Sequence, residues 1–131
     1  MERKIIVCLK KGGQRDMAEA FAERIGAVLT EQPGEELTVL FDASGVSLMG
    51  YGLTYQGNFE TMLHRVTCGR LQHEMLVRAA KKSGDSLKGI DATAGMGEDA
   101  FLLAAYGYEM TLYEQNPVVA ELLKDALRRA R

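Results

Sequence analysis

The chain has 131 residues, of which 47% are hydrophobic and 26% are charged, and its formal net charge is −2. This composition is typical of one soluble globular domain, or of part of a larger one, with enough apolar residues for a real core. It excludes the overall basic field that marks many nucleic-acid-binding proteins, so any contact with RNA must rest on a local patch.

The first part of the chain predicts a small mixed α+β arrangement. Residues 4–9 form an apolar run typical of a buried strand, which makes Cys8 a buried thiol of the core. Apolar residues at helical spacing predict a helix over 16–29, with Asp16 as its N-cap or first-turn acid. Residues 37–41 alternate as a half-buried strand, and one or two short strands follow between 46 and 55. A further helix is predicted over 70–82.

From residue 87 the pattern changes to alternating strands and helices. It predicts a strand over 87–91, a helix over 98–106, a strand over 110–113 and a helix over 118–130. This order implies a parallel sheet with right-handed crossovers. We therefore predict an α/β fold, in which residues 1–84 form the mixed α+β part and residues 85–131 begin a Rossmann-like, doubly wound sheet. Because such sheets have five or more strands, the chain is expected to be an N-terminal fragment.

A glycine-rich turn, DATAGMGED at 91–99, joins the first strand of this second part to its helix. Gly95, Gly97 and Ala100 fit the spacing G-x-G-x-x-A, and Glu114 follows the next strand, 19 positions after Gly95. Glycines let the backbone approach a ligand closely, and an acid at the end of the second strand can bind ribose hydroxyls. The pattern therefore indicates an adenosine-type ligand. An ordinary structural turn with an incidental surface glutamate is the alternative.

The charges of the turn distinguish between adenosine ligands. Glu98 and Asp99 stand at the start of the helix, where they favour the helix dipole but repel a pyrophosphate. Asp91 ends the entering strand, which in a dinucleotide site is normally apolar at that point. S-adenosylmethionine has no phosphate and carries a sulfonium and an ammonium, and Asp91 is placed to bind the ammonium. Charge therefore favours S-adenosylmethionine over nicotinamide or flavin dinucleotides.

Residues 91–130, from DATAGMGEDAF through YEQNPVVAELL, resemble the RsmJ-type small-subunit ribosomal RNA guanine-N2 methyltransferases. The resemblance extends upstream to the segment MLHRVTCGRLQHEMLVRAA and the strand IIVCL. It implies a class I, S-adenosylmethionine-dependent methyltransferase that acts on a guanine exocyclic amine. The ribosomal RNA, or the small ribosomal subunit, would be its partner.

The resemblance also implies roles for particular residues. Cofactor contacts would come from Glu98 and Asp99 after the glycine turn, and from Glu114 and Gln115 after the second strand, in addition to Asp91, Thr93, Gly95 and Gly97. The family usually has arginine at the positions of Glu98 and Gln115, so those two side-chain contacts are departures. His64 and Arg65 would line the substrate entrance or touch RNA phosphate, although a loop histidine and a solvated arginine are an equal alternative.

No catalytic base is identified in the chain, because the family's later D-P-M-F-P motif would lie beyond residue 131. The chain alone is therefore expected to bind the cofactor poorly and to methylate nothing. A nucleotide-binding oxidoreductase module and a non-catalytic assembly domain are the alternative functions. The two histidines lack metal-ligand spacing, so no metal is expected. Without an apolar stretch of about 20 residues no membrane contact is expected, and two distant cysteines fit a reducing cytoplasm. The sequence does not predict an oligomeric state.

Overall fold

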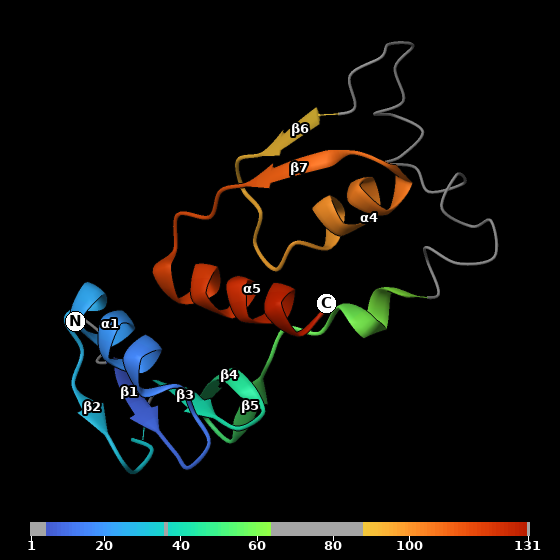
Figure 1. Cartoon of the computed structure of the whole chain (residues 1–131). Coiled ribbons are helices and arrows are strands. Elements are labelled where there is room, and N and C mark those ends of the chain that lie inside the picture. Colours follow the sequence, from blue (N-terminus) through green and yellow to red (C-terminus); the bar gives the residue numbers. More distant parts are fainter. Residues whose placement is uncertain (1–4, 36, 64–87, 131) are drawn as a thin grey trace. The chain divides into compact units, whose positions relative to one another are not determined.

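The computed structural model describes residues 5–35, 37–63 and 88–130, and its contacts divide the chain into two units (Figure 1). The first unit comprises the described residues up to Gly57 together with Lys124–Arg129, and the second comprises the described residues between Asn58 and Leu123 together with Ala130. The predicted boundary near residue 84 and the predicted helix over 70–82 lie outside the described residues, so both remain predictions. Among the described residues, no helix combines the length and apolar character needed to cross a membrane.

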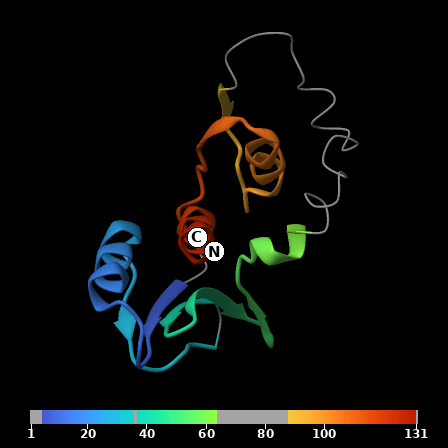
Figure 2. The same cartoon turned by 45° about the vertical axis from the view of Figure 1, so that its right-hand side comes forward.

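The first unit is built on a five-stranded mixed sheet with the strand order β2-β1-β3-β4-β5. Strand β1 pairs in parallel with both β2 and β3, whereas β3–β4 and β4–β5 are antiparallel. The strands are β1 (Ile5–Leu9), β2 (Leu29–Thr30), β3 (Leu37–Asp42), β4 (Gly45–Gly50) and β5 (Leu53–Tyr55). Helix α1 (Arg15–Ile25) connects β1 to β2 and lies beside the sheet in Figures 1 and 2.

The core of this unit forms between α1 and the central strands. Phe21 of α1 and Phe41 of β3 are almost fully buried, and their ring centroids lie 6.0 Å apart. Burial of such side chains is the main favourable term in folding. Cys8 is fully buried in β1, which confirms the prediction of a core thiol, and burial raises the pKa of its thiol.

Helix α1 is shorter than the sequence predicts, and the prediction that it continues to residue 29 is wrong. Gly26 adopts a left-handed conformation with φ of 70°, and its N–H bonds to the carbonyls of Ala22 and Glu23. This is a common way for a helix to end, since glycine enters that region without steric cost. Val28, expected on the apolar face, is 69% exposed, and Leu29 and Thr30 instead form β2.

The second unit contains the predicted succession of parallel strands and helices. Its elements are the 3-10 helix η1 (Phe59–Met62), β6 (Lys88–Asp91), α4 (Glu98–Tyr106), β7 (Glu109–Leu112) and α5 (Pro117–Arg129). Strand β6 pairs in parallel with β7, with Ile90 opposite Thr111, and α4 packs against β7 (Figures 1 and 2). The predicted helix over 98–106 agrees with α4 at both ends. Helix η1, which was not predicted, places Phe59 in a stacked contact with Phe101 of α4, with centroids 5.0 Å apart.

The last turns of α5 belong by their contacts to the first unit. There Asp125 is buried and accepts a hydrogen bond of 2.9 Å from Arg129, which also donates to the carbonyl of Gly57. Gly45 approaches this carboxylate so closely that an added Cβ would lie 2.7 Å from its oxygens. Arg129 is therefore a partner of Asp125 as well as a cation at the favourable end of the helix dipole.

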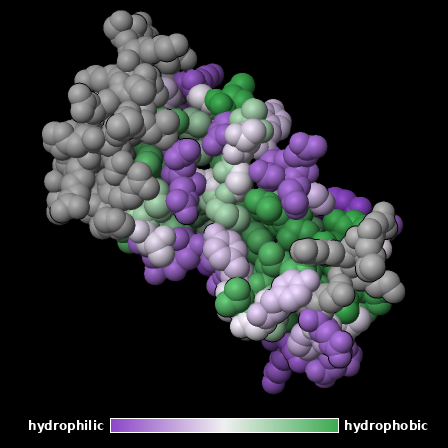
Figure 3. Space-filling view, turned by 180° about the vertical axis from the view of Figure 1, so that it is seen from behind, coloured by the Kyte–Doolittle hydropathy of each residue, from purple (hydrophilic) through white to green (hydrophobic). Residues whose placement is uncertain are grey.

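Several large apolar side chains remain on the surface, including Leu53 of β5 and Ile90 of β6, which are 75% and 73% exposed. Figure 3 shows hydrophobic residues among hydrophilic ones on the face opposite to that of Figure 1. A folded protein normally leaves part of its apolar surface exposed. These side chains therefore do not by themselves identify a binding surface.

Candidate functional site

The carboxyl ends of β6 and β7 lie next to each other because the two strands are parallel and in register. The pairing continues beyond the strands: Tyr113 N–H donates to the carbonyl of Asp91 at 2.8 Å, and Ala94 N–H donates to the carbonyl of Tyr113 at 2.9 Å. Asp91 also accepts a hydrogen bond of 3.1 Å from Thr93 N–H, which forms a local turn. The chain thus leaves β6 along a backbone path fixed by hydrogen bonds.

The two glycines of the turn occupy different surroundings. Both have a positive φ, 54° for Gly95 and 77° for Gly97, which disfavours other residues. A Cβ on Gly97 would lie 2.8 Å from Leu123 and 3.2 Å from Phe59, so this glycine is required by packing. A Cβ on Gly95 would meet nothing within 4 Å. Gly95 therefore presents open backbone at the position where the sequence predicts a ligand.

Glu114 follows β7 and connects the two strand ends. Its two carboxylate oxygens accept hydrogen bonds from Gly95 N–H at 2.9 Å and from Asn116 N–H at 2.8 Å. These backbone donors lower the pKa of Glu114, the bond from Asn116 N–H first and that from Gly95 N–H second, because both favour the charged form. Each oxygen still has a second lone pair, so the carboxylate can also accept a hydrogen bond from a hydroxyl group of a ligand.

The lowered pKa predicts a pH dependence of stability. Since the folded-state pKa lies below the ordinary value of 4.5, Glu114 contributes stability that is fully present above that value. This contribution is lost as the pH falls through the folded-state pKa. We expect the urea midpoint of the chain to fall more steeply below pH about 4.5 than that of the Glu114→Gln variant. Parallel curves for the two proteins would contradict this role of the carboxylate.

The other predicted site residues lie in the glycine turn and the start of α4, after β7, or outside the described residues. Glu98 and Asp99 are exposed in the first turn of α4, where the N-cap residue Gly97 has no side chain to cap the helix. Asp91 is half-buried and Gln115 is exposed. His64 and Arg65 lie outside the described residues. The structure therefore brings Asp91, Thr93 and Gly95 together with Glu114 at the strand ends, with the two acids of α4 following Gly97.

Asn116 is a site residue that sequence reasoning missed. Its N–H holds one oxygen of Glu114, while its side-chain oxygen accepts hydrogen bonds from Val118 N–H at 2.9 Å and Val119 N–H at 3.2 Å. The signal was present in the sequence, since an asparagine followed by a proline is typical of an N-cap and first helical position. Asn116 therefore fixes both the start of α5 and the orientation of Glu114.

The described residues contain no group of three or more histidine, cysteine, aspartate or glutamate side chains that could hold a metal ion. The arrangement at the strand ends consists of backbone donors, a glycine with free space beside it, and carboxylates. It can bind hydroxyl groups and positive charge, and it disfavours an anionic ligand.

The sequence model of a family described as "Putative SAM-dependent methyltransferase" matches residues 51–131 of the chain. This match covers more than half of the chain, including the whole glycine turn. The chain belongs to this family. The structure has the α/β fold that the sequence predicts, which confirms that prediction, and the family implies S-adenosylmethionine as the cofactor.

Relatives and a solved structure agree with the family. The chain is 39% identical to "Ribosomal RNA small subunit methyltransferase J" of Alkalilimnicola ehrlichii, over 87% of this chain and 47% of that protein. It is 33% identical to the protein of the same name from Pseudomonas aeruginosa strain LESB58, over 91% and 48%. The crystal structure of a SAM-dependent methyltransferase from Neisseria gonorrhoeae matches with a TM-score of 0.67 and 29% identity, covering 95% of this chain and 52% of that one. The chain thus spans about half the length of these relatives. The resemblance to RsmJ-type enzymes is thereby confirmed.

Proposed function

We propose that the chain forms part of an enzyme that transfers a methyl group from S-adenosylmethionine to a guanine exocyclic amine of small-subunit ribosomal RNA. The observation that carries the proposal is the acidic turn with open backbone at Gly95, joined to Glu114. The RNA substrate is supported by the names of the relatives, and a ribosomal substrate in bacteria implies a cytoplasmic location.

The residues fit this cofactor in shape and in charge. Gly95 has free space beside its Cα, so a ligand can approach the backbone there. Asp91 is placed at the end of β6, where its carboxylate can bind the ammonium of the amino-acid portion, with Thr93 beside it. Glu114 can accept hydrogen bonds from the ribose hydroxyls, while Gly97, Glu98, Asp99 and Gln115 are the remaining proposed cofactor contacts.

The fit is poorer for a dinucleotide. A pyrophosphate prefers a helix start with bare amides, but the first turn of α4 carries Glu98 and Asp99. The half-buried carboxylate of Asp91 would face the same phosphates. The acids therefore favour a cationic methyl donor over an anionic dinucleotide, which makes an oxidoreductase module the weaker alternative.

The bound cofactor supplies an electrophilic methyl group on a sulfonium that is already a good leaving group. The chain's own residues then contribute binding and orientation, because holding two reactants in line supplies a large part of such an acceleration. Glu114 and Asp91 would hold the two ends of the donor. His64 and Arg65 remain proposed contacts to the RNA. We further propose that the remainder of the site lies in the part of the relatives that this chain does not span, so that the chain alone binds the donor weakly and does not methylate.

Titration of the ¹⁵N-labelled chain, followed by NMR, tests the proposed cofactor even if binding is weak. S-adenosylhomocysteine is expected to shift the amide resonances of Gly95 and Asn116, with an affinity at least about tenfold higher than that of NADH, a difference of about 1.4 kcal/mol. Tighter binding of NADH at these amides would overturn the proposal in favour of an oxidoreductase. Amide shifts confined to residues remote from the turn would overturn the proposed site.

A further inference from the structure

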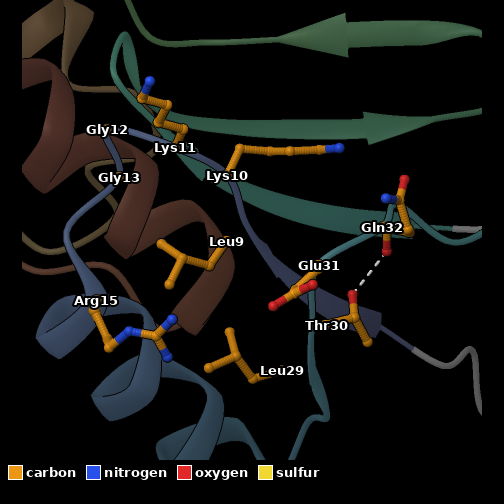
Figure 4. Close-up of a pocket in the computed structure, with 10 residues that line it drawn as sticks. All are labelled: Leu9, Lys10, Lys11, Gly12, Gly13, Arg15, Leu29, Thr30, Glu31 and Gln32. Atoms are coloured by element: carbon orange, nitrogen blue, oxygen red, sulfur yellow. Dashed lines mark hydrogen bonds between the residues drawn. The ribbon is translucent and has the colours of Figure 1, made fainter.

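A second hollow lies in the first unit, at the carboxyl ends of the parallel strands β1 and β2. It has a volume of about 600 Å³ and is formed by the loop after β1, the start of α1 and the loop after β2 (Figure 4). Its described lining includes Lys10, Lys11, Arg15 and Glu31, above Leu9 and Leu29. None of these residues belongs to the proposed methyl-donor site.

The hollow lies at the edge of the sheet where the parallel strands β1 and β2 end, and ligands of open α/β sheets bind at that carboxyl edge. Strand β1 lies between β2 and β3, and both neighbours are parallel to it. The chain leaves β1 toward β2 through α1 and then returns to the other side of β1 to form β3. The strand order therefore reverses between β1 and β3, and the hollow lies one strand away from that point, at the carboxyl ends of β1 and β2.

The loop that carries the lysines is held rigidly against β3. Lys10 N–H donates to the carbonyl of Phe41 at 2.9 Å, and Gly13 N–H donates to the carbonyl of Lys10 at 3.0 Å. A Cβ on Gly13 would lie 2.4 Å from the oxygen of Phe41, and one on Gly12, whose φ is 89°, would lie 2.6 Å from Cβ of Ala43. The two glycines thus serve close packing, and they present the lysines on a fixed backbone.

The hollow is positively charged in a chain that is negative overall. Lys10, Lys11 and Arg15 contribute three positive charges against the one negative charge of Glu31. Arg15 has a neighbour in Glu19 at 3.4 Å, but the two side chains are 65% and 53% exposed. Such an exposed pair is weak, so the guanidinium can exchange this partner for a stronger anionic one.

The directions of the cations favour an extended anion over a small one. Figure 4 shows the amino groups of Lys10 and Lys11 pointing away from each other, while Arg15 extends toward the leucines of the floor. In these orientations the three cations do not converge on one point. This arrangement favours a chain of phosphates, whose charges are spaced along a backbone, over a single phosphate.

We infer that this hollow, which we name the β1–β2 basic hollow (Lys10, Lys11, Arg15 and Glu31), binds the phosphate backbone of RNA. The inference rests on the proposed function for the identity of the polyanion. It assigns a second RNA contact, on the first unit, to residues that carry no methyl-donor contact.

Fluorescence anisotropy with a labelled single-stranded RNA of about 12 nucleotides, measured with the whole chain over a range of salt concentrations, tests the inference. The double variant Lys10→Gln/Lys11→Gln is expected to bind about tenfold more weakly at low salt, with a salt slope smaller by about 1.4. The matched control Lys88→Gln/Lys124→Gln removes two exposed charges outside the hollow and is expected to change the affinity by less than about twofold.

A second pair of variants tests the sign of the charge effect without removing any cation. Glu31→Gln is expected to tighten RNA binding about threefold, because it removes the negative charge of the hollow, whereas Glu109→Gln on β7 is expected to leave the affinity unchanged. Circular dichroism of each variant confirms that it is folded. Equal losses for the two lysine pairs, or no RNA binding by the parent chain, would overturn the inference.

Two further measurements separate the possible failures. In the first, unlabelled pyrophosphate and unlabelled RNA compete with the labelled RNA at equal phosphate concentration. Equally strong competition by the two would overturn the inference, since it would show a site for small anions. The change that S-adenosylhomocysteine causes in the amide resonance of Gly95 is expected to be the same in the parent chain and in Lys10→Gln/Lys11→Gln. Loss of RNA binding with these shifts intact leaves the proposed cofactor in place, whereas absence of the shifts in both proteins counts against the proposed function alone.

Discussion

Gly97→Ala is expected to lower the free energy of unfolding by about 2–4 kcal/mol, through a left-handed backbone and a crowded Cβ. A φ of 77° is energetically unfavourable for any residue with a Cβ. The added Cβ would also lie 2.8 Å from Leu123 and 3.2 Å from Phe59. Neither neighbour yields easily, because Leu123 is 5% exposed and Phe59 is stacked on Phe101. Urea unfolding followed by circular dichroism measures the effect.

Gly95→Ala is the matched control for this prediction. It has the same kind of backbone strain, with φ of 54°, but its Cβ would meet nothing within 4 Å. We therefore expect a loss of about 1–2 kcal/mol, from the backbone alone. If the methyl donor lies against Gly95, this variant should lose more S-adenosylhomocysteine affinity than its stability change explains. Equal destabilisation by the two substitutions would show that packing around Gly97 is not what requires a glycine.

Glu114→Ala is expected to lower the affinity for S-adenosylhomocysteine about 10- to 100-fold, the effect of losing hydrogen bonds to a charged group. The substitution removes the acceptor for the proposed ribose hydroxyls. It also releases Gly95 N–H and Asn116 N–H, so the turn loses the group that holds it to the end of β7. NMR titration of the variant chain gives the affinity.

Two further variants define what this result means. Glu114→Gln keeps one oxygen acceptor and should lose less affinity than the alanine variant. Glu109→Gln changes an exposed acid on the same strand and should bind as the parent does. An affinity unchanged in Glu114→Ala would contradict the proposed contact with ribose and leave the carboxylate with a structural role.

The alternation of strands and helices in the second unit could be predicted because local signals agree there. Gly97 and Gly107 flank α4, and the residues between them are mostly apolar and favour a helix. Both ends of this helix were therefore predicted correctly. Helix α1 shows the opposite case. Apolar spacing continued through Val28, whereas the left-handed Gly26 ended the helix, and β2 exists because Leu29 and Thr30 pair with Val7 and Cys8.

The sequence predicted that the candidate site residues Asp91, Gly95 and Glu114 would lie at neighbouring strand ends, but it did not predict their hydrogen bonds. The spacing of Gly95 and Glu114 indicated that both face one ligand, and a bond between them connects the two strand ends. That the same carboxylate also holds Asn116 N–H depends on where α5 begins, which is a tertiary property. Likewise, the different surroundings of Gly95 and Gly97 come from Leu123 and Phe59, which are distant in sequence.

In the proposed site, the hydrogen bond between Gly95 and Glu114 would also link the two ends of the methyl donor. Because the carboxylate that would recognise the sugar already restrains the peptide beside the amino-acid portion, much of the entropy of ordering that loop is lost before any ligand arrives. Occupancy of the sugar position and order of the glycine segment are then thermodynamically linked, so each must strengthen the other by the same factor.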